Sequence, residues 1–198
     1  MIAYLRGKIT YKCPTHLLLE TGGVGFLLKI SLYTYERVQA LEQCTLHTYL
    51  VVRHEGQSVA GFDLYGFYDE TERDLFDKLL SVSGIGAATA RMMLSSYKPE
   101  EICHAIATEN EVLIQSIKGI GPKSAKRIIL ELKDKVSKPE TETLIPATVN
   151  NKLKEEALSA LVALGFAKPA ADKTLNRLMA SGIHQNVETL IKEALKLL

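Results

Sequence analysis

A short glycine pattern occurs twice in this chain, and each copy stands between apolar segments with helical spacing. Gly-Ile-Gly is found at residues 84–86 and again at residues 119–121, an offset of 35 residues from Gly84 to Gly119. The apolar runs precede the two copies at residues 75–80 and 112–117 and follow them at residues 90–94 and 125–130. The sequence therefore predicts two units, each made of a helix, a tight glycine hairpin and a second helix.

The residues of each hairpin favour binding of an anion. Glycine adopts positive φ angles and lets another backbone come close, while the isoleucine between the glycines, Ile85 or Ile120, is suited to filling the gap between the helices. The second helix begins with free amide groups at the positive end of its dipole. Pro122 fits this assignment, because proline is tolerated in a first helical turn. For a doubled site, the natural anion is a nucleic-acid phosphate backbone.

Four basic residues lie around the second hairpin, and no acidic residue occurs between Glu111 and Glu131. Contacts from amides and lysines to phosphates position a protein on DNA without reading its bases. We therefore predict sequence-independent DNA binding with a marked salt dependence; a solvated basic helix face is the alternative. The predicted DNA-binding residues are Gly84, Ile85, Gly86, Ala87, Ala88, Lys118, Gly119, Ile120, Gly121, Lys123, Ser124, Lys126 and Arg127.

The overall composition is that of a globular protein and does not by itself indicate DNA binding. The chain has 198 residues, 46% of them hydrophobic, and a formal net charge of only +1. Any electrostatic footprint must therefore be local, or be built by assembling several chains. Three cysteines without a Cys-x-x-Cys spacing favour reduced thiols and argue against a zinc module. With no signal-like or membrane-spanning run, we expect a cytoplasmic protein without membrane contact.

The order of the patterns predicts an α+β, multidomain protein. Residues 1–67 carry short strands rich in branched and aromatic side chains, and they predict a small barrel of the oligonucleotide-binding (OB) type; a packing or oligomerisation module is the alternative role. Residues 68–136 hold the two hairpin units. Residues 137–151 are polar and punctuated by proline, which indicates a flexible linker. Residues 152–198 predict three short amphipathic helices that form a partner-docking unit.

Several element boundaries can also be predicted. Asp69-x-x-Glu72 is typical of a capping box at the start of the helical region, and Asn110 can cap the helix that leads into the second hairpin. The expected strands are 2–9, 17–20, 26–30 and 46–53, with about five in all, and the expected tail helices are 153–164, 167–179 and 187–198.

The segment from Arg53 to Asp63 joins two strand-like runs and predicts an extended hairpin tip. Its sequence Arg53-His54-Glu55 places an acid where a DNA-binding protein would ordinarily avoid one. A carboxylate facing phosphates is repulsive, so Glu55 could keep DNA strands apart. An ordinary polar surface turn is the alternative interpretation.

Catalytic patterns are absent from the sequence. Gly-Ile-Gly-Pro-Lys-Ser at 119–124 lacks the spacing of a nucleotide-binding loop, the five histidines are scattered, and no nucleophile lies in a recognisable turn. We therefore expect no cofactor, no metal and no enzymatic activity. A helix-hairpin-helix repair enzyme is the alternative: a glycosylase or lyase using Asp134, or a nuclease using Glu55, Asp63, Asp69 and Glu70. A protein-interaction scaffold is the third hypothesis.

A small barrel, two helix-hairpin-helix units, a linker and a three-helix tail, in this order, closely resemble the RuvA family of bacterial Holliday-junction branch-migration proteins. The resemblance covers essentially the whole chain. It is strongest at residues 1–7, 22–26, 51–53, 64–67, 119–127 and 160–166. Helix-hairpin-helix motifs alone occur in many repair proteins, whereas this combination is far rarer.

The resemblance implies a homotetramer, able to pair into an octamer, that holds a four-way DNA junction in an open form during recombination and DNA repair. Both hairpins of each subunit would bind phosphates, and Arg53, His54 and Glu55 would form an acidic pin at the crossover. The tail would dock RuvB, the hexameric ATPase that moves the DNA, and the resolvase RuvC would be a further partner. The residues implied in docking the motor are Leu158, Leu161, Leu164 and Phe166.

Two departures from the family pattern stand out. The hairpin tip has Arg53-His54-Glu55, where the family typically shows Arg-Glu-Asp, and its loop is longer by several residues. The first glycine hairpin has Ala87-Ala88 where Pro-Lys is usual, so we expect it to hold phosphate through backbone groups alone. Strand separation and grip on the DNA arms would both be altered.

Overall fold

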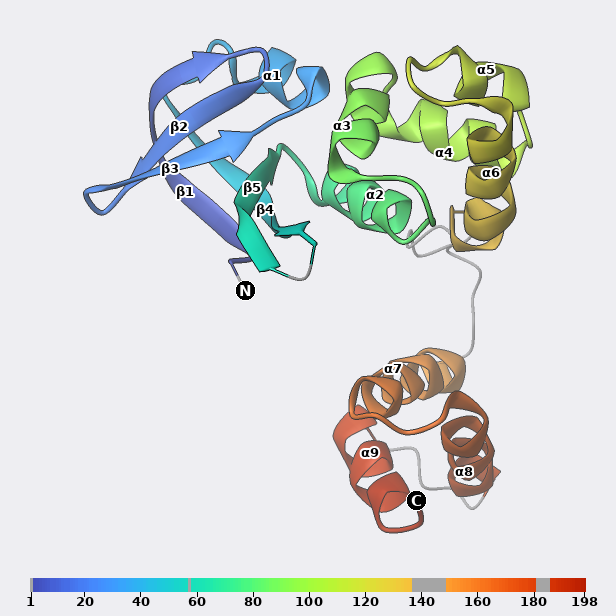
Figure 1. Ribbon diagram of the computed structural model, residues 1–198. Coiled ribbons are helices and arrows are strands. Elements are labelled where there is room, and N and C mark those ends of the chain that lie inside the picture. Colours follow the sequence, from blue (N-terminus) through green and yellow to red (C-terminus); the bar gives the residue numbers. More distant parts are fainter. Residues whose placement is uncertain (1, 57, 137–148, 181–185) are drawn as a thin grey trace. The chain divides into compact units, whose positions relative to one another are not determined.

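The computed structural model describes residues 2–56, 58–136, 149–180 and 186–198 (Figure 1). The chain divides into two compact units, Met1–Pro139 and Glu140–Leu198. The first unit holds the barrel and both glycine hairpins, and the second holds the tail helices.

Five strands form the OB-like barrel predicted for the amino-terminal part. In the sheet they follow the order β1-β2-β3-β5-β4, and β1 also pairs antiparallel with β4, which closes the ring. The seam between β3 and β5 is parallel and has one registered pair, Lys29 with Tyr65. The strands are β1 (Tyr4–Cys13), β2 (His16–Thr21), β3 (Val24–Lys29), β4 (Gln43–Glu55) and β5 (Ser58–Phe67).

The barrel interior is filled by side chains that alternate along the strands, as expected for a sheet with one buried face. Between β3 and β4 the chain forms helix α1 (Leu32–Val38), which the strand-based interpretation of residues 1–67 did not include. The hydroxyl of Ser31 caps this helix by accepting from the amide of Thr34. The buried barrel residues are Leu5, Leu17, Leu19, Leu28, Ile30, Val38 and Leu46.

Five helices follow the barrel and form the predicted pair of helix-hairpin-helix units. The first hairpin joins α2 (Glu70–Leu80) to α3 (Ala87–Ser96), and the second joins α5 (Glu111–Ser116) to α6 (Pro122–Val136); α4 (Pro99–Ala107) lies between the two units. Asn110 caps α5 by accepting from the amide of Leu113 at 3.1 Å, as predicted.

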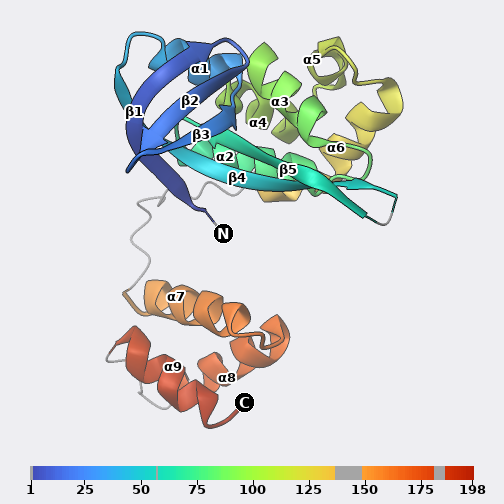
Figure 2. The same ribbon diagram turned by 60° about the vertical axis from the view of Figure 1, so that its left-hand side comes forward.

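Helix α2 lies beside β4 and β5 and joins the barrel to the helical part (Figures 1 and 2). The ring of Phe76 on α2 is buried against Tyr65 and Phe67 of β5, with centroid distances of 4.9 and 4.8 Å. Tyr49 of β4 packs edge-on at 5.5 Å. These barrel residues belong to the same hydrophobic cluster as Ile85 and the other buried residues of the two hairpin units.

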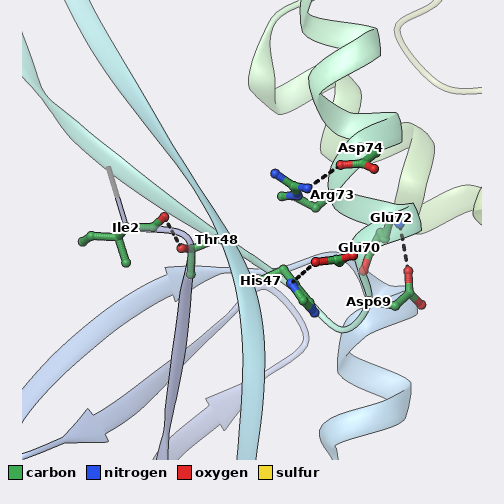
Figure 3. Close-up of polar contacts among 8 residues, drawn as sticks. All are labelled: Ile2, His47, Thr48, Asp69, Glu70, Glu72, Arg73 and Asp74. Atoms are coloured by element: carbon green, nitrogen blue, oxygen red, sulfur yellow. Dashed lines mark hydrogen bonds and ion pairs between the residues drawn. The ribbon is translucent and has the colours of Figure 1, made fainter. Parts of the chain in front are cut away.

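The capping box predicted at Asp69 forms only in part. The Asp69 carboxylate accepts from the amide of Glu72 at 2.8 Å, but the Glu72 side chain does not return to Asp69 (Figure 3). It is buried and accepts instead from the hydroxyls of Ser31 and Thr34 and from the amide of Tyr68. Burial raises the pKa of Glu72 to about 7, against the effect of these hydrogen bonds. Glu72 thus links α2 to the start of α1.

Three helices form the second unit, α7 (Val149–Ala163), α8 (Lys168–Ala180) and α9 (Val187–Leu195). Helix α7 begins inside the range predicted as linker; residues 137–148 of that range lie outside the described residues. Gly165 has a φ of 97° and allows the amide of Phe166 to reach the carbonyl of Leu161 at 3.1 Å, which ends α7. The core residues are Ala157, Leu161, Ala171, Leu175, Leu178, Leu190 and Ala194.

We expect the stability of the first unit to fall as pH rises from about 4.5 to about 7. In that window an unfolded chain releases the Glu72 proton while the folded chain keeps it, so ionisation favours unfolding, by about 3 kcal/mol in total. The variant Glu72→Gln should lose this slope. All eight tyrosines lie between residues 4 and 97, so urea unfolding followed by tyrosine fluorescence reports on this unit.

Glu70→Gln is the matched control for that measurement, because Glu70 lies on the same helix with a side chain that is 71% exposed. It should keep the slope of the original protein. An unchanged pH slope in Glu72→Gln would contradict the assignment.

Candidate nucleic-acid interface

The two glycine hairpins repeat each other in backbone geometry. Gly84 has a φ of 89° and Gly119 a φ of 91°, so both need the left-handed region that glycine adopts without strain. The isoleucine after each one is buried, with 7% of Ile85 and 5% of Ile120 exposed. Its amide donates back to the preceding helix, to Val82 in the first hairpin and to Ile117 in the second. The two hairpins predicted from the sequence are therefore present, and the isoleucine of each is buried as expected.

Each hairpin presents the start of a helix at the surface. The first intrahelical bond of α3 runs from Ala90 to the carbonyl of Gly86, and that of α6 runs from Ala125 to the carbonyl of Gly121. Gly86 provides no side-chain cap, so the first-turn amides of α3 keep their capacity to donate. A Cβ atom added at Gly86 or Gly121 would meet nothing within 4 Å. The space in front of these helix starts is open to a ligand.

The second hairpin carries exposed cations and the first does not. Lys118, Lys123 and Lys126 are exposed, and in the part of the chain that the structure describes none of them pairs with a carboxylate. Ser124 is half-buried beside them, while Ala87 and Ala88 hold the corresponding places of the first hairpin.

Two arginines near the first hairpin are engaged within the protein. Arg91 on α3 donates to the carbonyl of Thr15 in the barrel at 3.0 Å. Arg127 on α6 donates to the carbonyl of Ser83 at 2.9 Å. Arg127 was predicted as a DNA-binding residue, and its internal contact is one that the sequence pattern gave no signal for.

The β4–β5 hairpin forms the extended tip predicted from Arg53 onward and projects beyond the rest of the barrel (Figure 2). The backbones of His54 and Glu55 pair with Val59 and Ser58, but their side chains lie outside the described part. The guanidinium of Arg53 lies 3.3 Å from the carboxylate of Asp63, which also pairs with Lys29 at 2.7 Å. Arg53 is thereby held against the opposite strand.

Of the residues considered for a repair enzyme, those whose side chains the structure describes do not converge; the side chain of Glu55 lies outside that part. Asp63 pairs with Lys29 and Arg53, Asp69 accepts from the amide of Glu72 and the hydroxyl of Tyr33, and Glu70 lies 3.6 Å from His47 (Figure 3). Asp134 is exposed on α6, roughly 18 Å along the helix axis from its first residue. Among the described residues, no group of three His, Cys, Asp or Glu side chains is arranged to hold a metal.

The four residues implied in motor docking have different surroundings. Leu161 is 0% exposed and belongs to the core of the second unit, so it cannot contact a partner directly. Leu158 and Phe166 are half-buried against that core, and Leu164 is 60% exposed. Val162, Leu195 and Leu197 of the same unit are also exposed. Helical spacing alone could not separate these side chains from the core.

Of the helices described, none has the length and apolar character needed to cross a bilayer.

An OB-like barrel joined to two helix-hairpin-helix units, with a separate three-helix unit, defines a multidomain protein of the tandem helix-hairpin-helix class. Comparison with known families is more specific. Residues 1–66 match the RuvA N terminal domain, residues 76–134 the SAM-like helix-hairpin-helix tandem, and residues 152–198 the RuvA C-terminal domain.

Full-length relatives agree with these matches. The chain is 42% identical over 196 residues to proteins of Christiangramia forsetii and Flavobacterium psychrophilum, covering 99% of both chains in each case. It is 40% identical over 203 residues to a protein of Cytophaga hutchinsonii, covering 100% of both. Each relative bears the name Holliday junction branch migration complex subunit RuvA. The chain belongs to the RuvA family.

The two glycines of the second hairpin should respond differently to alanine. At Gly119 the φ of 91° strains any other residue, so Gly119→Ala should destabilise the first unit by about 1–2 kcal/mol. At Gly121 the backbone has no positive φ and the added methyl meets open space, so Gly121→Ala should fold normally and weaken DNA binding by obstructing the approach of a phosphate. Tyrosine-detected unfolding and a DNA-binding titration separate the two effects; undiminished binding by Gly121→Ala would contradict close backbone approach.

Proposed function

We propose that this chain binds four-way Holliday junctions without sequence preference and acts as the recognition subunit of a branch-migration complex. The observation that carries the proposal is the pair of matching hairpins, which present uncapped helix starts on one compact unit. Family membership and the names of the relatives support the junction as the DNA substrate.

In this function the backbone amides and the exposed lysines hold phosphates and leave the bases unread. Lys118, Lys123 and Lys126 supply charge at the second hairpin, while the first hairpin contributes amides at the start of α3. The projecting β4–β5 hairpin would stand at the crossover, where the carboxylate of Glu55 repels phosphates and favours separated strands.

The active assembly is a homotetramer that can pair into an octamer. A chain with a net charge of +1 has a weak field of its own, but a local basic patch repeated about a symmetry axis becomes an extended footprint. Such an assembly also matches the symmetry of a junction with four arms.

The chain itself would be non-catalytic and would work in the cytoplasm. The RuvB hexameric ATPase would supply the motion, docking on the tail unit, and the RuvC resolvase would act on the same junction. Leu164 is the most exposed of the implied docking residues. Leu158 and Phe166 are half-buried and pack against the core of the second unit.

A gel-shift comparison of a synthetic four-way junction with linear duplex of the same arm sequence tests the DNA substrate. With excess competitor duplex and a salt series, we expect strong preference for the junction. The double variant Lys123→Glu and Lys126→Glu should reduce junction affinity on the order of 100-fold, because two phosphate contacts per subunit become repulsive.

Lys173→Glu with Lys192→Glu makes the same charge change on exposed residues of the second unit and should leave binding intact. Equal binding of junction and duplex would reduce the protein to a general DNA binder, and no binding at low salt would favour an interaction scaffold. Cleavage or base release by the purified chain would favour the repair-enzyme hypothesis.

The docking surface can be tested by comparing an exposed and a buried leucine. Leu164→Asp should leave junction binding and helix content unchanged but abolish RuvB-dependent branch migration, because a charge replaces an exposed apolar contact. Leu161→Ala should instead destabilise the second unit by about 2–5 kcal/mol, because it opens a cavity in its core. Circular dichroism on heating distinguishes the two; full motor stimulation by Leu164→Asp would place the docking surface elsewhere.

A further inference from the structure

Arg127 connects the helix of the second hairpin to the loop of the first. Its Nη1 donates to the carbonyl oxygen of Ser83 at 2.9 Å, immediately before Gly84. The same nitrogen lies 3.8 Å from the place where a Cβ of Gly84 would stand. Because the donor is a charged guanidinium, this is a charge-assisted hydrogen bond, among the stronger kinds that proteins form.

The contact is part of a face of α6 that follows the first hairpin loop. Arg127, Glu131 and Lys135 are four residues apart and lie on one side of the helix. The Nε of Arg127 lies 4.0 Å from a carboxylate oxygen of Glu131, and Lys135 reaches the hydroxyl of Ser81 at 3.5 Å. The Arg127 side chain, which is 52% exposed, thus contacts both Glu131 and Ser83.

The first hairpin has no equivalent donor toward the second. The 35-residue offset of the repeat places Met92 where the second unit has Arg127, and the Met92 side chain is 44% exposed. On its other flank, α3 is tied to the barrel by Arg91 and the carbonyl of Thr15. The hairpin without lysines of its own is therefore held by arginines on two sides.

Holding the Ser83 carbonyl also directs the amide of Gly84. The two groups belong to one planar peptide unit and point in opposite directions, so a hydrogen bond to the carbonyl fixes where the amide points. In the part of the chain that the structure describes, the Gly84 amide donates to no acceptor. It is left available for a phosphate oxygen.

We propose that Arg127 is a positioning residue, which sets the first hairpin relative to the second so that both meet phosphates of the same DNA arm. The proposal rests on the junction-binding function given above. It differs from the prediction that Arg127 itself binds phosphate, because the positioned contacts are backbone amides that carry no charge. Preorganisation of this kind lowers the ordering cost of binding.

Salt dependence separates the two roles. A cation that contacts phosphate contributes about 0.9 to the slope of log K against log salt, whereas an uncharged amide releases few counterions. We expect Arg127→Ala to weaken junction binding roughly tenfold with the slope unchanged. Arg127→Lys keeps the charge but loses the planar fork and should restore little affinity. Lys126→Ala is the matched control on the neighbouring residue and should lower the slope.

Hydrogen exchange on the free protein tests the positioning role without DNA. In Arg127→Ala the amide of Ile85, which donates to Val82, should exchange faster, while the amide of Ile120, which donates to Ile117, should not. A lowered salt slope in Arg127→Ala together with recovery in Arg127→Lys would overturn the proposal in favour of direct phosphate contact, and unchanged exchange would overturn it too. If Lys123→Ala and Lys126→Ala also bind junctions normally, the proposed function fails, whatever the exchange result.

Discussion

The packing of Phe76 against three rings of the barrel is the contact on which the arrangement of the first unit depends. Tyr49 lies on β4, Tyr65 and Phe67 lie on β5, and all three meet this one side chain of α2. Strands β4 and β5 also carry the projecting hairpin, and α2 leads directly into the first glycine hairpin. The packing of this one aromatic residue therefore joins the strands of the projecting hairpin and the helices of the glycine hairpins within one compact unit.

Apolar packing alone would not fix the position of α2 on the barrel, because hydrophobic burial is not directional. Glu72 adds direction. Its buried carboxylate accepts from Ser31, Thr34 and Tyr68, and each of these hydrogen bonds depends on distance and angle. Burial raises the pKa of Glu72 and so disfavours its charged form, while its hydrogen bonds to Ser31 and Thr34 connect α2 to the start of α1.

The features that sequence could predict are those fixed by local chemistry. Gly84 and Gly119 need positive φ, Asn110 caps its own helix, and the strand pattern marks the barrel. The features that it could not predict join residues far apart in the chain. Glu72 meets Ser31 across 41 residues and Arg127 meets Ser83 across 44, and neither sequence neighbourhood indicates a partner. Helix α1 and the burial of Leu161 were missed for a related reason, since packing rather than propensity decides them.

The unequal chemistry of the two hairpins explains where the internal arginine contacts occur. In the proposed function, the exposed lysines of the second hairpin would attract phosphate over several ångströms, and their long flexible side chains would tolerate small errors of position. At the first hairpin, Ala87 and Ala88 carry no charge. A backbone amide stabilises a phosphate only at hydrogen-bond distance and angle. If the first hairpin binds DNA through its amides as proposed, it must be positioned accurately before DNA binds. Arg91 on α3 donates to the barrel carbonyl of Thr15, and Arg127 donates to the carbonyl of Ser83 in the hairpin loop. Two arginines thus hold in place a hairpin that carries no cation of its own.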